Sequence, residues 1–370
     1  MSPEWAGRES PIETRISARV RAGAIAALLA RPALPSILGM QGTPPATPVA
    51  TPPATPVAAT RILPVEMVVP LTGPGAPSVN DTAEMGGVWG TDLGSTFMHG
   101  DEMYMIFGDT FGENNSDWRS NVASVITDDD PSDGLVFDRM IEDVPNHAKE
   151  LLPAKRIDFD EITVIPTYGV AVGDRLFLHY MSVAHWGVPG TWDLGLSGWA
   201  YSDDAGANWT KDPAATWPGD SNFGQVAIEE HEGHLYIYGI PGGRFGGVHL
   251  ARVIPANLLR IDTYEYWNGS VWVSGDLATA AEIVPPTVGE LSVRWNSYYN
   301  RWIMMYLDES SYAIVMRASD DLRGPWGDQM TVATGQEFPA LYAPSQFPKW
   351  NDGPDIYFTM SMFGSYQVYL

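Results

Sequence analysis

From Arg61 to the C-terminus, short runs of hydrophobic and aromatic residues alternate with polar turns, and almost no helical periodicity is present. One unit recurs in this pattern: a strand, a polar turn, and a second strand rich in aromatic and β-branched residues. The expected second strands are Met103–Phe107, Arg175–Tyr180, His234–Tyr238, Arg301–Leu307 and Asp355–Met360. The pattern therefore predicts an all-β domain.

The unit repeats with a long and fairly regular period. The spacings between equivalent positions are 73, 59, 67 and 54 residues, measured at Tyr104, Phe177, Tyr236, Ile303 and Tyr357. A β-sandwich has no such period, whereas a propeller blade of four strands and their loops requires it. We therefore predict a five-bladed β-propeller over residues 61–370, with the segment Ile62–Pro70 completing the last blade and closing the ring.

Two turn motifs fit the blades. Ser202–Trp209 matches the Asp-box pattern S-x-D-x-G-x-x-W, in which an Asp side chain ties the turn, Gly supplies a positive φ, and Trp packs beneath. Ser319–Trp326 is a related turn, of a kind common in five-bladed glycosidase propellers. We interpret both as structural.

The N-terminal part differs in composition. The sequence TPPATPVA occurs at Thr43–Ala50 and again at Thr51–Ala58, and proline at this density favours extended polyproline II over a sheet ladder. A basic stretch before the apolar run Ala22–Ala30 fits a signal peptide, although Arg31 interrupts the run. We expect residues 1–60 to be a disordered signal-like segment and linker, and the protein to be secreted or tethered to the cell surface.

The composition limits the classes of molecule that the protein is expected to bind. Aromatic residues reach 11% while charged residues are only 18%, which suits surfaces that bind weakly charged, flat ligands such as sugars. The net charge of −24 disfavours nucleic acid and anionic membranes, and no run approaches the ~20 apolar residues of a membrane span. The absence of cysteine excludes disulfides, thiolate nucleophiles and cysteine-based zinc sites. We expect a monomer with a polysaccharide substrate and with no cofactor or metal.

The first expected hairpin carries the candidate chemistry. Asp92 lies in GTDLG (Gly90–Gly94), and Asp109 lies in FGDTFG (Phe107–Gly112). With the turn centred between residues 100 and 101, cross-strand partners have numbers that add up to 201, so the two aspartates should face each other with Cβ atoms about 5 Å apart. Like charges placed this way are destabilising, which favours a functional reason for the pair.

Paired carboxyl groups are what glycoside hydrolysis needs. One carboxyl group, held protonated by its neighbour's charge, donates to the leaving oxygen, and the other activates water, attacks carbon or stabilises the oxocarbenium ion. Two alternatives stay open: both aspartates are turn or cap residues near strand ends, or together they bind calcium. We predict Asp92 and Asp109 as the catalytic residues.

Further residues are candidates for substrate binding. Glu290 precedes an expected inner strand and is either a third carboxylate or a solvated strand start, and Gln346 is expected to open the strand of the last blade. Arg244, between glycines, either contacts ligand or pairs with an inner-strand acid. His185 and Trp186 lie in an expected flexible loop and either stack on sugar or pack in the core. The full set of predicted binding residues is Trp89, His185, Trp186, Arg244, Glu290 and Gln346.

Several long motifs, in order, resemble the domain-of-unknown-function 4185 family. They are the two aspartate motifs, Ile165–Gly187, Gly239–Val253, Gly289–Asn296 and Ala343–Ser361, and the likeness covers nearly all of residues 80–370. That family is similar to five-bladed glycosidase propellers and includes the endo-D-arabinofuranosidases of glycoside hydrolase family 183, which cut the D-arabinan of mycobacterial arabinogalactan and lipoarabinomannan. The resemblance implies that Asp92 and Asp109 form the catalytic pair.

Two hypotheses follow. The first is an endo-acting glycoside hydrolase that cleaves furanosidic D-arabinan, and the second is a non-catalytic cell-wall glycan-binding propeller, such as an adhesin or attachment module. The aspartate pair favours the enzyme, because a lectin has no need of opposed carboxylates.

Overall fold

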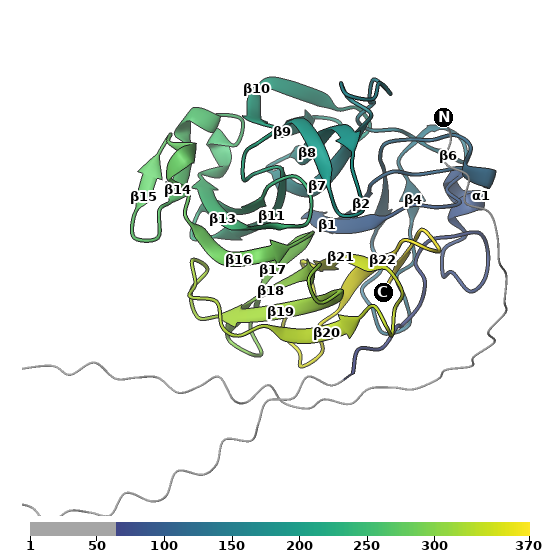
Figure 1. Cartoon of the computed structure of the whole chain (residues 1–370). Coiled ribbons are helices and arrows are strands. Elements are labelled where there is room, and N and C mark those ends of the chain that lie inside the picture. The colour runs from purple at the N-terminus through teal and green to yellow at the C-terminus, as the bar shows by residue number, and fades with distance from the viewer. Residues whose placement is uncertain (1–63) are drawn as a thin grey trace, which may run out of the picture.

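A computed structural model describes residues 64–370, and these residues form an almost entirely β structure (Figure 1). The expected signal-like segment and repeat linker, residues 1–60, lie outside the described residues. The helical elements are short: α1 (Thr82–Gly86), η1 (Glu113–Asn115), η2 (Pro255–Asn257), η3 (Ile261–Thr263) and η4 (Leu277–Thr279). The all-β prediction is confirmed.

The strands form five antiparallel sheets of three to six strands and one two-stranded hairpin. The first sheet contains β1 (Leu93–His99), β2 (Glu102–Phe107), β3 (Val122–Ile126) and β4 (Arg139–Met140); the hairpin is β5 (Glu142–Val144) with β6 (His147–Ala148). The second sheet contains β7 (Thr163–Val172), β8 (Arg175–Trp186), β9 (Trp192–Ser202) and β10 (Thr210–Pro218). The third contains β11 (Gln225–His231), β12 (His234–Ile240), β13 (Gly246–Val253), β14 (Glu265–Trp267), β15 (Trp272–Ser274) and β16 (Glu282–Val288). The fourth contains β17 (Leu291–Asn296), β18 (Arg301–Asp308), β19 (Ala313–Ser319) and β20 (Met330–Thr334), and the fifth contains β21 (Leu341–Gln346), β22 (Phe358–Met362) and β23 (Gln367–Tyr369).

The first strands of the five sheets contact one another in a cycle. Strand β1 contacts β7, β7 contacts β11, β11 contacts β17, β17 contacts β21, and β21 contacts β1. In Figure 1 these strands lie towards the middle of the molecule, while β10, β15 and β20 lie at its edge. Because each sheet runs outward from its first strand, the starts of five different sheets meet around one axis.

Each expected second strand is the second strand of its sheet, as β2, β8, β12, β18 and β22. The last begins at Phe358, three residues after the expected start at Asp355. The chain around Pro70 pairs with β23: Leu71 N donates to Val368 O, and Leu370 N donates to Val69 O, both bonds at or below 2.9 Å. The chain near the start of the described region therefore extends the last sheet, as expected.

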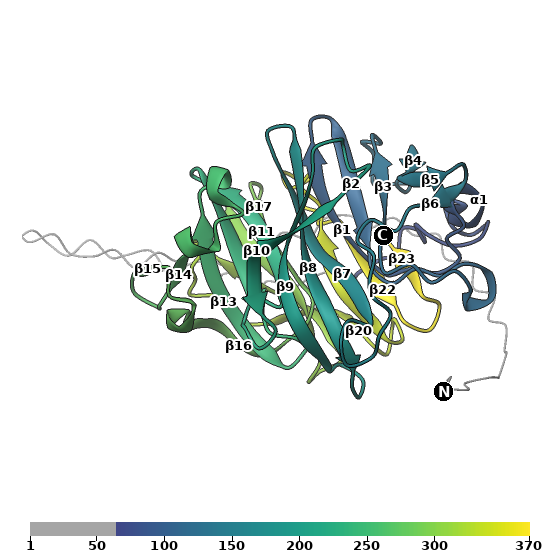
Figure 2. The ribbon, with the colours of Figure 1, turned by 90° about the horizontal axis from the view of Figure 1, so that it is seen from above.

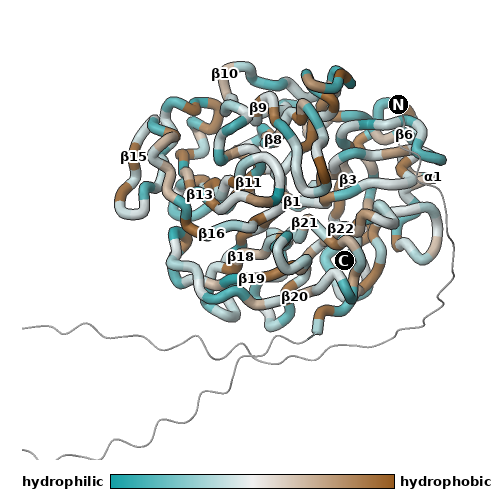
Figure 3. The backbone as a smooth tube through the Cα atoms, viewed as in Figure 1, coloured by the Kyte–Doolittle hydropathy of each residue, from teal (hydrophilic) through white to brown (hydrophobic). Residues whose placement is uncertain are grey.

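Hydrophobic residues pack between neighbouring sheets. The largest cluster joins the second, third and fourth sheets and includes Trp199, Trp217 and Tyr238, all fully buried. A second cluster, with Phe107 and Phe347, fills the space between the first and fifth sheets. Hydrophobic stretches accordingly run along the strands in Figure 3, with hydrophilic residues mainly in the connections. The arrangement of sheets side by side is visible from above in Figure 2.

The Asp-box turn forms as the sequence predicts. Asp204 Oδ1 accepts from Ser202 Oγ and from Asn208 N, both at 2.8 Å, and Gly206 has a φ of 84°. Trp209 Nε1 donates to Gly206 O at 2.9 Å, which holds the indole against the turn. The motif closes the connection from β9 to β10, far along the chain from the aspartate pair.

Candidate active site

The candidate site lies at the end of the molecule where the first strands begin. Asp92 immediately precedes β1, Thr163 begins β7, Glu290 immediately precedes β17, and Tyr342 is the second residue of β21. Since β2 runs antiparallel to β1, the segment after β2, with Asp109, returns to the same end. The fold thus gathers polar residues from several sheets around the axis.

The two aspartates do not lie directly opposite each other, although the hairpin arithmetic predicted that they would. Pairs from Ser95↔Ile106 onward follow that arithmetic, but a bulge at Gly94 shifts the pairing to Leu93↔Phe107. Gly108 N therefore donates to Asp92 O at 3.1 Å, and Asp92 lies opposite Gly108. A Cβ on residue 108 would lie 2.4 Å from Asp92 Oδ1, so glycine is required there for the carboxyl group to occupy its place.

The carboxyl group of Asp92 is held by two tyrosines, one in β21 and one in the turn between β22 and β23. Tyr342 and Tyr366 donate to Asp92 Oδ2 at 2.8 and 3.2 Å, while Oδ1 is buried without a hydrogen-bond partner. Burial raises the pKa of Asp92 to about 7, with further raising by the charges of Asp109 and Glu290 and partial lowering by the two tyrosine hydrogen bonds. Asp92 is therefore suited to carrying a proton near neutral pH.

Asp109 has a different set of neighbours. Its Oδ1 accepts from Thr163 Oγ1 at 2.6 Å and from Trp118 Nε1 at 2.8 Å. Burial raises the pKa of Asp109 to about 6, while these two hydrogen bonds and the charge of Arg156 lower it. Of the two carboxyl groups, Asp109 is thus the one whose surroundings favour the anion.

Glu290 and Arg244 form an ion pair beside the aspartates. Arg244 Nη2 lies 2.9 Å from Glu290 Oε1, and the guanidinium lies over the Tyr342 ring at 4.9 Å from its centroid. The alternative of a salt bridge to an acid next to an inner strand is therefore realised for Arg244. Glu290 Oε2 is buried and unpartnered, so this carboxylate keeps one oxygen free towards the axis.

A small pocket lies beside Leu93, the residue that follows Asp92. It encloses about 50 Å³, room for a few water molecules or small polar groups, and its polar lining comes from all five sheets. These residues are Ser95, Thr167, Gln225, Glu290 and Ser345. The hydroxyl oxygens of Ser95 and Ser345 are buried without partners, which marks a place where water or a ligand hydroxyl would be hydrogen-bonded.

Gln346 is not placed for substrate binding. It ends β21 rather than opening it, is almost fully buried, and donates from Nε2 to Ile303 O at 3.1 Å and to Ser292 O at 3.3 Å. These bonds tie the fifth sheet to the fourth. The strand begins at Leu341, earlier in the sequence than predicted, and the Gln346 amide donates to backbone carbonyl groups instead of facing the site.

His185 and Trp186 lie in extended strand, not in the flexible loop that the sequence suggested. Strand β8 continues to Trp186, which faces Trp192 of β9 with ring centroids 5.5 Å apart. His185 stacks on Phe159 at 4.1 Å and bonds to Asp158 through Nδ1 at 2.6 Å. The hairpin of β8 and β9 therefore places packed aromatic rings next to the site.

Exposed aromatic side chains surround this end of the molecule. Trp89, three residues before Asp92, and Trp186 are each 39% exposed. Phe159, Phe245, Tyr312 and Phe363 are also exposed, and each lies in a connection that joins strands at the same end. We name these six residues the aromatic rim. Rings presented around a polar centre suit the flat faces of sugar rings.

The sequence did not single out Thr163, Tyr342, Tyr366, Trp118 or Arg156. Thr163 and Tyr342 lie at the starts of inner strands. Glu290 was predicted because polar residues at such starts are expected near the axis, and the same reasoning applied to the correct strand boundaries would have included Thr163 and Tyr342. The other three lie in connections, where no local pattern indicates that they reach an aspartate.

Residues 64–370 contain neither a candidate metal site nor a candidate membrane-spanning helix. No group of three or more His, Asp or Glu side chains in this range is arranged to hold a metal ion. Within the same range, no helix has the length and apolar character needed to cross a membrane.

Comparison with known sequences agrees with the motifs. Residues 77–370 match the family described as a domain of unknown function, DUF4185. The chain belongs to this family. None of the curated proteins matches the chain.

Solved structures share the fold of this DUF4185 chain. A protein from Bacteroides ovatus ATCC 8483, described as a putative hydrolase, is similar with a TM-score of 0.55 and 15% identity, over 78% of this chain and 86% of that chain. An exo-β-1,3-galactanase from Phanerochaete chrysosporium, solved with galactose, has a TM-score of 0.50 and 11% identity, over 82% of this chain and 64% of that chain. At these identities the likeness concerns the fold alone.

Proposed function

We propose that this protein is a five-bladed β-propeller glycoside hydrolase in which Asp92 is the general acid and Asp109 the carboxylate partner. The observation that carries the proposal is the pair of half-buried carboxyl groups with opposite surroundings. Each carboxyl group accepts two hydrogen bonds, but the charges of Asp109 and Glu290 raise the pKa of Asp92 further, whereas the charge of Arg156 lowers the pKa of Asp109. This arrangement favours the protonated form of Asp92 and the ionised form of Asp109.

The chemistry follows from these two states. Asp92 transfers its proton to the glycosidic oxygen as the bond from that oxygen to the anomeric carbon breaks. Asp109 either removes a proton from the attacking water or attacks the anomeric carbon itself. Tyr342 and Tyr366, which donate to Asp92 Oδ2, stabilise the anion that Asp92 becomes after the transfer.

We propose furanosidic D-arabinan of mycobacterial-type cell walls as the substrate, cleaved internally by a secreted or surface-tethered monomer. Support for the substrate comes from the motifs shared with the arabinan-cleaving members of the family. The aromatic rim surrounds the polar centre on all sides, which fits a chain that extends past the site in both directions. The acidic net charge of −24 is compatible with a neutral glycan.

Incubation with arabinogalactan tests the function directly. New reducing ends and released oligosaccharides are expected from the wild-type protein and not from Asp92→Asn or Asp109→Asn. Binding of arabinogalactan without any new reducing ends would instead favour the glycan-binding alternative, to which the aromatic rim is equally suited.

An aryl arabinofuranoside with a good leaving group tests the assignment of roles. Such a leaving group departs without protonation, so Asp92→Asn should keep much of its activity on this substrate while losing on the order of 10²–10⁴-fold on arabinan. Asp109→Asn should be inactive on both substrates. The reverse result would exchange the two roles.

A further inference from the structure

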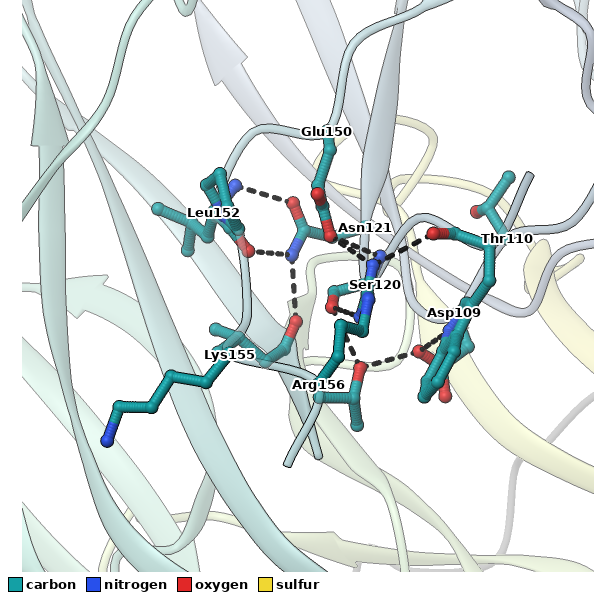
Figure 4. A network of polar contacts seen from close by, with 12 residues as sticks. Asp109, Thr110, Ser120, Asn121, Glu150, Leu152, Lys155 and Arg156 are labelled. Atoms are coloured by element: carbon teal, nitrogen blue, oxygen red, sulfur yellow. Dashed lines mark hydrogen bonds and ion pairs between the residues drawn. The ribbon is translucent and has the colours of Figure 1, made fainter. Parts of the chain in front are cut away.

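Behind Asp109 lies a chain of polar side chains that ends on a partly buried arginine, Arg156. Thr163 Oγ1 lies 2.6 Å from Asp109 Oδ1 and 3.0 Å from Ser120 Oγ. Arg156 donates to Ser120 Oγ through Nη1, and its Nη2 donates to Trp118 O at 2.9 Å. In Figure 4, Arg156, Ser120 and Asp109 belong to one connected set of dashed contacts.

Thr163 and Ser120 are the two links between Asp109 and Arg156. A guanidinium only donates, so Ser120 Oγ accepts from Arg156, and Thr163 Oγ1 is also oriented to donate to Ser120 Oγ. Thr163 has a single hydroxyl proton, and its shorter contact, at 2.6 Å, is with Asp109 Oδ1, which only accepts when ionised. Arg156 therefore fixes the position of Ser120, which contacts the threonine that donates to Asp109.

Arg156 also fixes the second donor to Asp109. Its guanidinium carbon lies 4.2 Å from the centroid of the Trp118 ring, whose Nε1 bonds to Asp109 Oδ1. Arg156 itself has a φ of 62°, a conformation that favours glycine over an arginine. The side chain of Arg156 contacts Ser120, Trp118 and Glu150. A strained backbone conformation at a residue with these contacts is consistent with a positioning role.

The charge of Arg156 is only partly neutralised. Glu150 Oε1 accepts from Arg156 Nη2 at 2.5 Å and from Ser120 N at 2.8 Å. Both charges act on Asp109, with Arg156 lowering its pKa more than Glu150 raises it. Asp92 before β1 and Tyr366 between β22 and β23 also act on Asp109, while Arg119 and Lys211 act on Glu150.

We propose that Arg156 is a positioning residue for the reaction: through Ser120, Thr163 and Trp118 it holds Asp109 in place and keeps it ionised, with Glu150 limiting the effect. The effect of Arg156 on turnover rests on the proposed function, whereas its effect on Asp109 can be measured without any substrate. Arg156 and Glu150 carry opposite charges next to one carboxylate, so removing each charge should shift the pKa of Asp109 in the opposite direction. A purely structural role of Arg156 would not produce such opposite shifts.

The pH dependence of kcat/KM is the first readout. Activity needs ionised Asp109, so it falls as the pH drops through the pKa of Asp109. Arg156→Met should move this acid limb to higher pH by roughly one unit. Glu150→Gln, which keeps an acceptor oxygen for Arg156 and Ser120, should move it to lower pH. Arg156→Lys keeps the charge and should restore most of the wild-type limb.

A matched control is available in the same sheet. Arg139 pairs with Glu102 at 2.7 Å near the turn between β1 and β2, at the opposite end from Asp109. Arg139→Met should leave the pH profile unchanged. A uniform loss at all pH values in Arg156→Met, or shifts in the same direction for Arg156→Met and Glu150→Gln, would overturn the proposal.

A second readout needs no substrate. Carbon-detected NMR titration of the aspartate carboxyl groups, with the Asp109 signal assigned from Asp109→Asn, should give the same opposite shifts. If the wild-type protein cleaves no glycan, the proposed function fails while this titration still decides the action of Arg156. If Arg156→Met does not fold, as judged by its melting curve, Arg156→Lys and Glu150→Gln still give the comparison, and unchanged Asp109 titration in Glu150→Gln would refute it.

Discussion

Replacing Asp92 by asparagine should stabilise the protein while removing most of its turnover. The folded state raises the pKa of Asp92 from 3.8 to about 7, mainly through burial and then through the charges of Asp109 and Glu290. One pKa unit corresponds to about 1.4 kcal/mol, so ionised Asp92 costs up to about 4 kcal/mol of folding stability. The amide side chain in Asp92→Asn would keep the shape and an acceptor for the tyrosines without that charge.

The sign of the pH dependence is fixed by the direction of the shift. Because the folded pKa exceeds the unfolded one, the folded protein binds the proton of Asp92 more tightly between about pH 4 and pH 7. The wild-type protein therefore loses stability from this group as pH rises through that window. The advantage of Asp92→Asn should be smallest near pH 4 and largest above pH 7.

Thermal unfolding at several pH values measures this effect. Since the entropy of unfolding is about 2.1 cal/mol/K per residue, about 1 kcal/mol shifts the Tm of a domain of about 300 residues by roughly 1.5 °C, so a gain of up to about 6 °C is expected at pH 8. Loss of stability at pH 8, or an equal gain at pH 4.5 and pH 8, would refute the reasoning. Turnover of the same variant should fall on the order of 10²–10⁴-fold.

Asp308 provides a control, because its pKa is shifted in the direction opposite to that of Asp92. Burial alone would raise its pKa, but side-chain hydrogen bonds hold the pKa well below the usual range. The donors are Thr287, Ser310, Ser311 and Gln329, at 2.5 to 2.8 Å. Asp308→Asn should therefore destabilise the protein at neutral pH, with an effect that shrinks in acid.

Three further predictions concern the site and its support. The pH profile of kcat/KM should be bell-shaped, highest between the pKa values of about 6 and about 7 of Asp109 and Asp92, and an optimum above pH 8 would contradict the assignment. Trp186→Ala should raise KM for long arabinan oligosaccharides with kcat little changed, because the indole belongs to the aromatic rim; an unchanged KM would remove it from the binding surface. Gln346→Ala should lower the free energy of unfolding by about 1–3 kcal/mol in a denaturation titration, since it leaves buried backbone acceptors unpaired, whereas an effect on KM alone would restore its binding role.

Much of the architecture was determined by local sequence. The alternation of apolar and polar residues fixes which side of a strand is buried, and tight turns fix its hairpin partner, so the second strands and the Asp-box turn were predictable. The motifs around Asp92 and Asp109 likewise placed both residues in one hairpin, because their separation spans only two strands and a turn. The bulge at Gly94 was not foreseen, since it depends on packing against Val368 of the last sheet, where a Cβ on residue 94 would come within 2.9 Å.

The electrostatics of the site were decided only by the tertiary structure. Tyr342, which donates to Asp92, is 250 residues away in the sequence, and Thr163, which donates to Asp109, is 54 residues away. A pKa depends on burial and on every charge or donor within a few ångströms, and no local pattern records these neighbours. The sequence by itself therefore determined that two aspartates share a hairpin, whereas the cycle of five sheets decided which of them is surrounded by acids and which is reached by an arginine.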